Sequence, residues 1–158
     1  MIVVSNATPI ITLSSIGRLD IFEYFFGAVY IPEAVYDEIK AKEAYGYREI
    51  DGPLFVVKRI RDAFAQDILL NDLDRGEAQT IVLAKELQAD IVLIDETIGY
   101  RIAQSQQLNV RRTLSLLIAA KKKGYLKAVK PLMDAMLKQE RWISQRVYRD
   151  VLALCAEE

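Results

Sequence analysis

The sequence predicts an α/β fold, a three-layer α/β/α sandwich around a central parallel sheet, and two observations predict it. Apolar runs rich in β-branched residues alternate with segments of helical periodicity, which is typical of parallel strands joined by right-handed helical crossovers. The run Ile91–Ile94 is apolar throughout, as expected for a strand buried on both faces. No repeat, linker or low-complexity stretch interrupts the 158 residues, so we expect a single domain over residues 1–158.

In the first half of the chain, capping and turn residues mark where the elements begin and end. Thr8 and Pro9 indicate the N-cap and the first residue of a helix, and Gly17 and Gly27 end two helices. Residues 43–53 contain two glycines and indicate a loop. The expected elements are strands at Ile2–Val4, Ala28–Ile31 and Leu54–Val57, helices at Pro9–Ile16, Leu19–Phe26 and Glu33–Lys42, and a short helix within Ile60–Asp72.

The second half continues the alternation and finishes in helices. Asp74 and Glu77 form a capping-box pattern that starts a helix running to about Gln88. Val110 lies in a short edge strand, and Thr113 caps the helix that follows it. The remaining expected elements are the strand at Ile91, a helix over Glu96–Gln107, and two C-terminal helices from about Val129 and from Ser144, whose apolar stripes indicate packing in the core or in a dimer.

Composition excludes several kinds of chemistry. The chain has no histidine, which removes Ser–His and Cys–His nucleophile pairs, histidine general bases and almost every zinc site. The single cysteine, Cys155, excludes an internal disulfide. Neither a membrane-spanning segment nor a secretory signal is present, so we expect a cytoplasmic protein without membrane contact.

Charge is unevenly distributed along the chain. Residues 1–110 carry 10 Lys+Arg against 17 Asp+Glu, whereas residues 111–158 carry 11 against 5. A basic C-terminal segment is either a solvated helix face or a surface for phosphates, because lysine and arginine supply most nucleic-acid affinity. Lys121, Lys122 and Lys123 are candidates for contact with an RNA backbone.

The topology predicts that acidic residues gather at one edge of the sheet. Asn6 and Asp95 each follow a predicted strand, and the carboxyl ends of parallel strands form the edge where such sheets bind ligands. Glu77 lies in the first turn of its helix and so reaches the same edge. Glu38 lies about five residues into its helix, roughly 7.5 Å along the axis, from where a long side chain can reach back. Glu96, directly after Asp95, is a weaker fifth member.

Clustered carboxylates repel one another, and a hard divalent cation is the usual reason for such a cluster. Oxygen ligands without nitrogen or sulfur favour Mg²⁺ or Mn²⁺, which can activate a water and neutralise a phosphodiester. Structural alternatives stay open for each residue. Asp74 and Glu77 fit a capping box, Asp95 is a good N-cap for the next helix, Thr8 caps the first one, and Glu38 is compatible with an exposed helix position.

Four segments together resemble the PIN domain family, in particular a prokaryotic subgroup related to VapC-type toxins. They are Val3–Ile10 (VVSNATPI), Ile31–Glu38 (IPEAVYDE), Leu73–Ala78 (LDRGEA) and Leu93–Glu96 (LIDE). The resemblance covers most of the chain and extends through the helix after Thr113. It implies a PIN-like α/β/α fold and a metal-dependent ribonuclease, often the toxin half of a toxin–antitoxin pair. Family members commonly form homodimers, with the antitoxin typically encoded next door.

The resemblance assigns the acidic quartet to Asn6, Glu38, Glu77 and Asp95, with Thr8 as the hydroxyl beside the first member. The catalytic residues would be Glu38, Glu77 and Asp95, and Mg²⁺ or Mn²⁺ would be held by these residues with Asn6 and Glu96. One position departs from the family, whose first acid is usually aspartate. The amide oxygen of Asn6 can ligate a cation, but it brings no charge and cannot act as a base.

The sequence therefore predicts a Mg²⁺- or Mn²⁺-dependent endoribonuclease acting on RNA, with Glu77 and Asp95 as the principal ligands. The main alternative is a catalytically silent PIN fold that serves as an RNA- or protein-binding module, which Asn6 favours. A receiver-type signalling domain shares the three-layer architecture, but it needs acids after the first strand, where Ser5 and Asn6 offer none.

Overall fold

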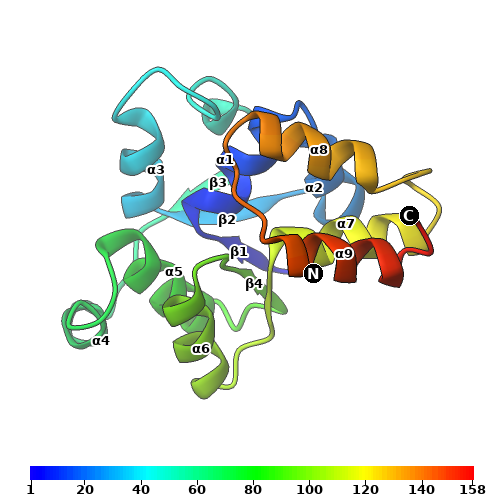
Figure 1. Cartoon of the computed structure of the whole chain (residues 1–158). Coiled ribbons are helices and arrows are strands. Elements are labelled where there is room, and N and C mark those ends of the chain that lie inside the picture. The colour runs from blue at the N-terminus through cyan, green and yellow to red at the C-terminus, as the bar shows by residue number, and fades with distance from the viewer.

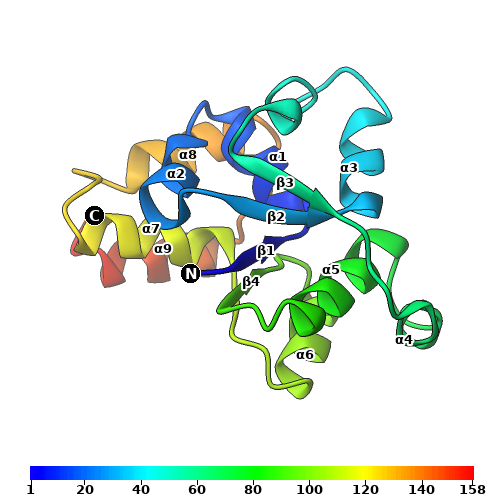
Figure 2. The same ribbon diagram turned by 180° about the vertical axis from the view of Figure 1, so that it is seen from behind.

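The computed structural model describes residues 1–158 and contains one five-stranded sheet with all neighbouring strands parallel, in the order β3-β2-β1-β4-β5 (Figure 1). The three-layer α/β/α fold predicted from the sequence is confirmed, because helices cover both faces of this sheet (Figure 2). The strands are β1 (Val3–Ser5), β2 (Val29–Pro32), β3 (Phe55–Lys58), β4 (Ile91–Leu93) and β5 (Val110–Arg111).

The helices on the two faces bury separate apolar cores. On one face, 25 buried residues from β1 to β4, the helices and their connections form the larger core; the smaller core of 10 buried residues lies on the other face. The larger core contains side chains of α1 (Ala7–Ser15), α2 (Asp20–Phe26), α3 (Glu33–Lys40), α7 (Thr113–Lys122), α8 (Lys130–Lys138) and α9 (Gln145–Leu154). The smaller core is covered by α5 (Arg75–Glu86) and α6 (Thr97–Ser105), with α4 (Ala63–Leu69) packed against α5.

The order of the strands creates a crevice beside β1. The chain runs from β1 to β2 and β3 on one side, and then returns to place β4 and β5 on the other side. Ser5 pairs with Leu93, so the carboxyl ends of β1 and β4 lie next to each other, as the sequence predicted. Such a reversal of strand order separates the loops that follow the two strands, and ligands bind in the resulting crevice.

The helices begin close to where the sequence places them, with two differences in capping. The first helix begins at Ala7, and the N-cap position is occupied by Asn6, not by Thr8 as predicted. Thr8 is the second helical residue, because the strand ends at Ser5 and a proline fits anywhere in the first turn, where backbone N–H groups have no intrahelical acceptor. Thr113 is likewise the first residue of α7 and not its cap.

The C-terminal helices are joined to the rest of the fold by Glu157. Its carboxylate accepts the backbone N–H groups of Val129 and Lys130 at the start of α8, at 2.8 and 3.0 Å, and pairs with the Lys121 ammonium at 2.9 Å. Burial alone would raise the pKa of Glu157, but these three donors outweigh it and lower the pKa to about 2. Residues 43–53, predicted as a loop, contain one short 3₁₀ turn, η1 (Glu49–Asp51).

None of the helices is both long enough and apolar enough to span a membrane.

Candidate active site

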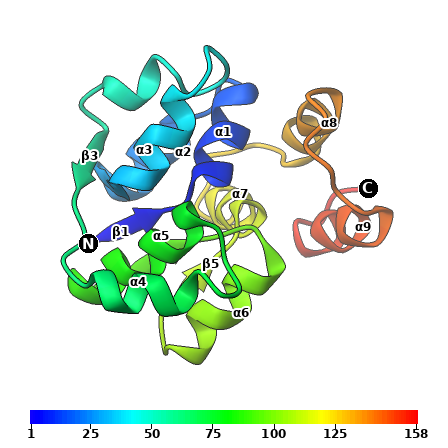
Figure 3. The same cartoon turned by 90° about the vertical axis from the view of Figure 1, so that its left-hand side faces the viewer.

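The crevice at the carboxyl ends of β1 and β4 collects side chains from four elements. Figure 3 looks onto this edge, with the first turn of α1 next to α3 and α5. Asn6 leaves β1, Glu96 follows β4, Glu38 lies in the last turn of α3, and Asp74 and Glu77 start α5. Asn6, Glu96, Asp74 and Glu77 lie where a strand ends or a helix begins, whereas Glu38 reaches the site from the end of its helix.

Glu96 is the carboxylate that connects the two central strands. It accepts hydrogen bonds from the Asn6 amide nitrogen at 3.3 Å and from the Thr8 hydroxyl at 2.8 Å. Asn6 is almost fully buried, with 3% of its surface exposed. Because Thr8 lies inside the first turn of α1 and does not cap it, its hydroxyl is free to orient Glu96. From the sequence, Glu96 was the weaker candidate of the two acidic residues after β4. In the structure it occupies the central position of the cluster.

Asp95 faces away from these residues. One of its carboxylate oxygens accepts the Thr113 backbone N–H at 2.8 Å, and the other accepts the Thr113 hydroxyl at 2.7 Å. Side chains that follow one another at the end of an extended strand point to opposite faces, so Asp95 and Glu96 cannot both enter the crevice. Asp95 therefore accepts the hydrogen bonds of Thr113 at the start of α7. The sequence predicted Asp95 as a principal metal ligand, with the N-cap of α6 as the structural alternative, and Glu96 occupies that N-cap position.

Burial raises the pKa of the Asp95 carboxyl, and the hydrogen bonds from Thr113 oppose that rise. The Arg112 guanidinium donates to the backbone carbonyl of Asp95 at 3.0 Å and stacks on the Tyr100 ring at 4.3 Å. These contacts fix the β4–α6 connection against the start of α7. Asp95 thus orients the residue that follows it, Glu96.

Glu77 takes part in the capping box that the sequence suggested and also faces the crevice. Its backbone N–H donates to Asp74 at 2.8 Å, and one of its carboxylate oxygens accepts the Asp74 N–H at 3.4 Å. The other oxygen lies over Gly99 in α6, only 2.7 Å from where a Cβ atom would stand. Glycine at position 99 therefore leaves the space that the Glu77 carboxylate occupies.

A second glycine marks where the remaining oxygens converge. A Cβ atom at Gly76 would lie 3.0 Å from a Glu38 carboxylate oxygen, 3.4 Å from the Asn6 amide oxygen and 3.5 Å from an Asp74 carboxylate oxygen. Glu38 and Asn6 therefore share one rim, as predicted. Sequence reasoning treated Asp74 only as a helix cap, although its place before the first turn of α5 sets it on this edge as well.

The electrostatics show that the cluster is short of positive charge. The pKa of Glu38 is raised by burial and by repulsion from Asp74 and Glu96. Burial, together with repulsion from Asp74 and Glu96, also raises the pKa of Glu77 to about 7, and Glu77 is only 9% exposed. No lysine or arginine forms an ion pair with Glu38, Glu77 or Glu96. A cation would relieve this repulsion.

Comparison with known protein families identifies the family to which this chain belongs. Residues 2–157 match the PIN domain family. The chain is a PIN domain. No curated protein and no solved structure matches the chain with significance. PIN domains are generally nucleases or have other RNA-related functions, and PIN nucleases generally use divalent metal ions.

The donor chemistry of this PIN domain suits such an ion. Glu38, Glu77, Glu96 and the Asn6 amide offer oxygen atoms only, which is the preference of Mg²⁺ and Mn²⁺. In the arrangement described, no three carboxylates gather closely enough to hold a metal ion. Glu96 is engaged by Asn6 and Thr8, and Glu77 by the capping box. An ion would therefore be held only after at least one of these side chains changes rotamer.

The lysines predicted to contact RNA do not all remain available in the PIN domain. The Lys121 ammonium donates to the Cys155 carbonyl at 2.6 Å and to Glu157 at 2.9 Å, so it holds the C-terminus. Lys122 and Lys123 are exposed. Sequence spacing placed the three lysines together, but adjacent helical residues point in different directions.

Proposed function

We propose that this PIN domain is a divalent-metal-dependent endoribonuclease that acts on single-stranded RNA. The observation that carries the proposal is the group of Glu38, Glu77 and Glu96 at the crevice between β1 and β4, with raised pKa values for Glu38 and Glu77 and no cationic partner. In this proposal Glu77 and Glu96 are the principal ligands, Glu38 is an outer ligand or positions water, and Asn6 is a neutral ligand. Asp95 has a structural role.

Mg²⁺ or Mn²⁺, when bound, would polarise the scissile phosphodiester and neutralise the charge that develops on it. The residues of the chain prepare that site. Thr8 and Asn6 orient the Glu96 carboxylate, and Gly99 leaves room for Glu77. Because its pKa is about 7, Glu77 can take up or release a proton near neutral pH.

The test is cleavage of a mixed-sequence single-stranded RNA during a Mn²⁺ titration. Glu77→Gln and Glu96→Gln should each reduce metal-stimulated cleavage by at least 100-fold, an order of magnitude typical for loss of a group that stabilises developing charge. Asp37→Asn is the matched control, because Asp37 neighbours Glu38 on α3 and is likewise exposed, but its carboxylate is paired with Arg75 at 3.2 Å. Unchanged cleavage in both Gln variants, or none at any Mn²⁺ concentration, would end the proposal.

The second candidate function is a catalytically silent PIN fold that binds RNA or a protein. One observation favours it: Asn6 is neutral and its amide nitrogen holds Glu96 as a hydrogen-bond donor, which an aspartate in that place could not do. RNA binding without cleavage at any Mn²⁺ concentration would select this candidate.

We also propose, from the resemblance to VapC-type proteins, that the protein is the toxin of a toxin–antitoxin pair and forms a homodimer. A neighbouring gene for a small helix-turn-helix or ribbon-type protein would support the pairing. Failure of that neighbour to bind the protein or to inhibit its RNA cleavage would refute it. Sedimentation of the purified protein tests the dimer.

A further inference from the structure

The turn between α8 and α9 exposes an aromatic side chain that the fold does not use. Trp142 is 85% exposed, more than any other large apolar side chain, and it is the only tryptophan in the chain. Its sequence neighbour Ile143 is buried, so the turn is anchored while the indole stays in water. Indole rings usually lie where one face is covered, which makes such exposure informative.

Basic residues outnumber acidic ones in the sequence on either side of this tryptophan. Between residues 138 and 150 the chain carries four basic side chains and only two acidic ones, Glu140 and Asp150. The basic residues are Lys138, Arg141, Arg146 and Arg149. Of these only Arg146 has an ion-pair partner, Asp150, at 4.0 Å and with both side chains exposed, so the pair holds it weakly.

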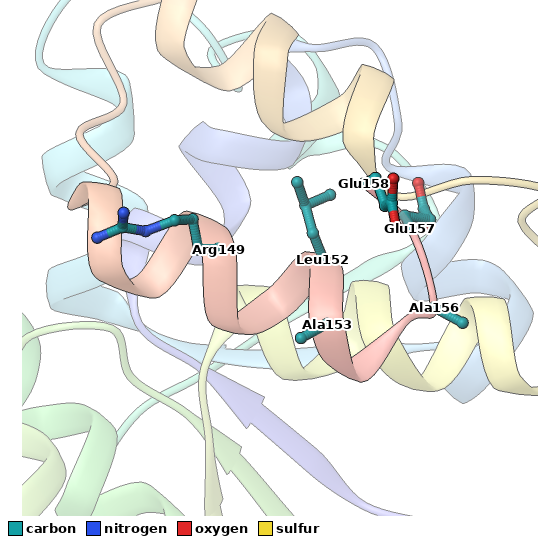
Figure 4. Close-up of a pocket in the computed structure, with 6 residues that line it drawn as sticks. All are labelled: Arg149, Leu152, Ala153, Ala156, Glu157 and Glu158. Atoms are coloured by element: carbon teal, nitrogen blue, oxygen red, sulfur yellow. The ribbon is translucent and has the colours of Figure 1, made fainter.

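Two of these arginines are available to a ligand at the turn: Arg149 points toward it, and Arg141 has an unpaired donor there. In Figure 4 the Arg149 guanidinium extends along α9 toward its N-terminal end, away from Glu157 and Glu158. The Arg141 Nε atom is shielded from solvent and has no hydrogen-bond partner, the single buried side-chain donor in the protein left in that state. An unmet donor of this kind costs stability, and a phosphate oxygen is a suitable acceptor once the side chain turns outward.

A second exposed ring lies at this turn, on the loop that follows α3. The Tyr45 hydroxyl donates to the Gln139 side-chain oxygen at 2.6 Å, three residues before Trp142, and the Tyr45 side chain is 43% exposed. The loop that carries Tyr45 follows α3, which bears Glu38. Lys40 of α3 anchors this loop, because its ammonium donates to the Tyr47 carbonyl at 2.9 Å and lies 3.5 Å above the Tyr47 ring.

The α8–α9 turn meets the loop that follows α3 through the bond between Tyr45 and Gln139. In Figures 1 and 3 the α8–α9 turn lies on the side of the molecule toward which β1 points, the same side as the first turn of α1. The loop after α3 reaches over from the other flank of α1. Tyr45 therefore links the loop that follows α3, the helix of Glu38, to the turn that carries Trp142.

We infer that Tyr45, Arg141, Trp142, Arg146 and Arg149 form a binding platform for single-stranded RNA, in which the two rings stack on bases and the arginines contact phosphates. This inference rests on the proposed nuclease function, because the platform would hold the RNA that the site cleaves. Its test measures binding alone and does not depend on cleavage. Aromatic rings that alternate with arginines are the standard chemistry for unpaired nucleotides. The exposed residues near Trp142 in the turn are polar or charged, and Ile143 is buried, which suits a polyanion better than an apolar protein face.

The direct experiment uses the fluorescence of Trp142 in the full chain without metal, so that no cleavage occurs. A 12-nucleotide single-stranded RNA of mixed sequence should quench the emission, because a stacked base lies against the only tryptophan. The same sequence as a duplex should quench it much less, because its bases are already paired and stacked. Emission that does not respond to the single strand would refute the platform.

Variants measure the contributions with a fluorescein-labelled RNA of the same sequence. Trp142→Ala should weaken binding at least fivefold, since loss of one base–aromatic stack has at least that effect, and Trp142→Phe should recover most of the affinity. Arg146→Gln with Arg149→Gln should flatten the slope of log K against log salt by about 1.4, or 0.7 for each lost phosphate contact on a single strand. All three variants should keep the parent melting temperature because the altered side chains are exposed.

Phe64→Ala and Arg61→Gln are the matched controls, since both side chains are exposed near α4, away from the turn. They should leave RNA affinity and its salt slope unchanged. If Trp142→Ala leaves RNA affinity unchanged but abolishes self-association or binding of another protein, the turn is a protein interface and the inference fails. Quenching without any Mn²⁺-dependent cleavage would support the platform and reject the nuclease. Cleavage without quenching would support the nuclease and reject the platform.

Discussion

Replacing Asp95 separates a structural role from a metal-binding role. Asp95→Ala removes the acceptor of the Thr113 N–H and of the Thr113 hydroxyl, and Thr113 is only 2% exposed, so water cannot replace either contact easily. A buried donor left unpaired costs about 1–3 kcal/mol. Two such donors, less the desolvation cost of the lost carboxylate, suggest about 2–3 kcal/mol of lost stability.

In a chain of this size, 1 kcal/mol corresponds to about 2–4 °C in Tm, so Asp95→Ala should lower the Tm by about 4–12 °C. Asp95→Asn keeps one acceptor oxygen and should lower it by about half as much. The measurement is a thermal melt in EDTA, with Asp37→Asn as the exposed carboxylate control. A double-mutant cycle with Thr113→Val should show coupling, because the two side chains share a hydrogen bond.

The reasoning is refuted if Asp95→Ala and Asp95→Asn melt like the parent and nevertheless lose all Mn²⁺-dependent cleavage of RNA. That outcome would restore Asp95 as a metal ligand and would leave Glu96 as the structural residue. If instead both variants melt lower but retain cleavage at temperatures well below their Tm, the assignment of the two acids made from the structure stands.

Three further predictions concern charge. Because the folded-state pKa of Glu77 is about 7, against an ordinary 4.5, the metal-free protein should lose about 2–3 kcal/mol of stability as pH rises from about 4.5 to 7, and Glu77→Gln should remove this loss in melts across that range. Asn6→Asp replaces the donor to Glu96 by a further negative charge in the acidic cluster, so it should lower the Tm in EDTA. On adding Mn²⁺ the Tm should rise more than that of the parent and RNA cleavage should be faster; a variant indifferent to Mn²⁺ would favour the silent module. Glu157 has a folded-state pKa of about 2, so Glu157→Gln should cost about 1–2 kcal/mol at pH 7, and the difference should shrink in melts as pH falls from about 4.5 toward 2.

Local patterns in the sequence were sufficient for most of the fold. The apolar run at Ile91–Ile94 and the alternation of strands and helices predicted the parallel sheet, and the pairing of Ser5 with Leu93 confirms that the first strand neighbours it. The capping box at Asp74 and Glu77 is present as predicted. These features depend on residues within one turn or one strand of each other, which is why a single sequence contains them.

The sequence also determined where acidic residues gather, because strand ends and helix starts share one edge in a parallel sheet. It did not determine which way each side chain points. Asp95 and Glu96 are adjacent, but they bind different partners. Asp95 accepts from Thr113, 18 residues later, and Glu96 accepts from Thr8, almost 90 residues earlier. The backbone N–H of Thr113 at the start of α7 binds one of the two carboxylates. No local sequence pattern reveals that this N–H lies beside Asp95 in the fold.

The same reason explains Lys121 and Tyr45. A run of three lysines suggests a phosphate surface, but packing brings Glu157 and the Cys155 carbonyl to Lys121 and leaves its neighbours exposed. Tyr45 lies in a loop without any pattern of its own, and only its bond to Gln139 shows that it lies at the end of α8, close in sequence to Trp142. Periodicity determines elements and edges, whereas the partner of each charged or aromatic side chain is set by contacts between segments distant in sequence, which only the tertiary structure decides.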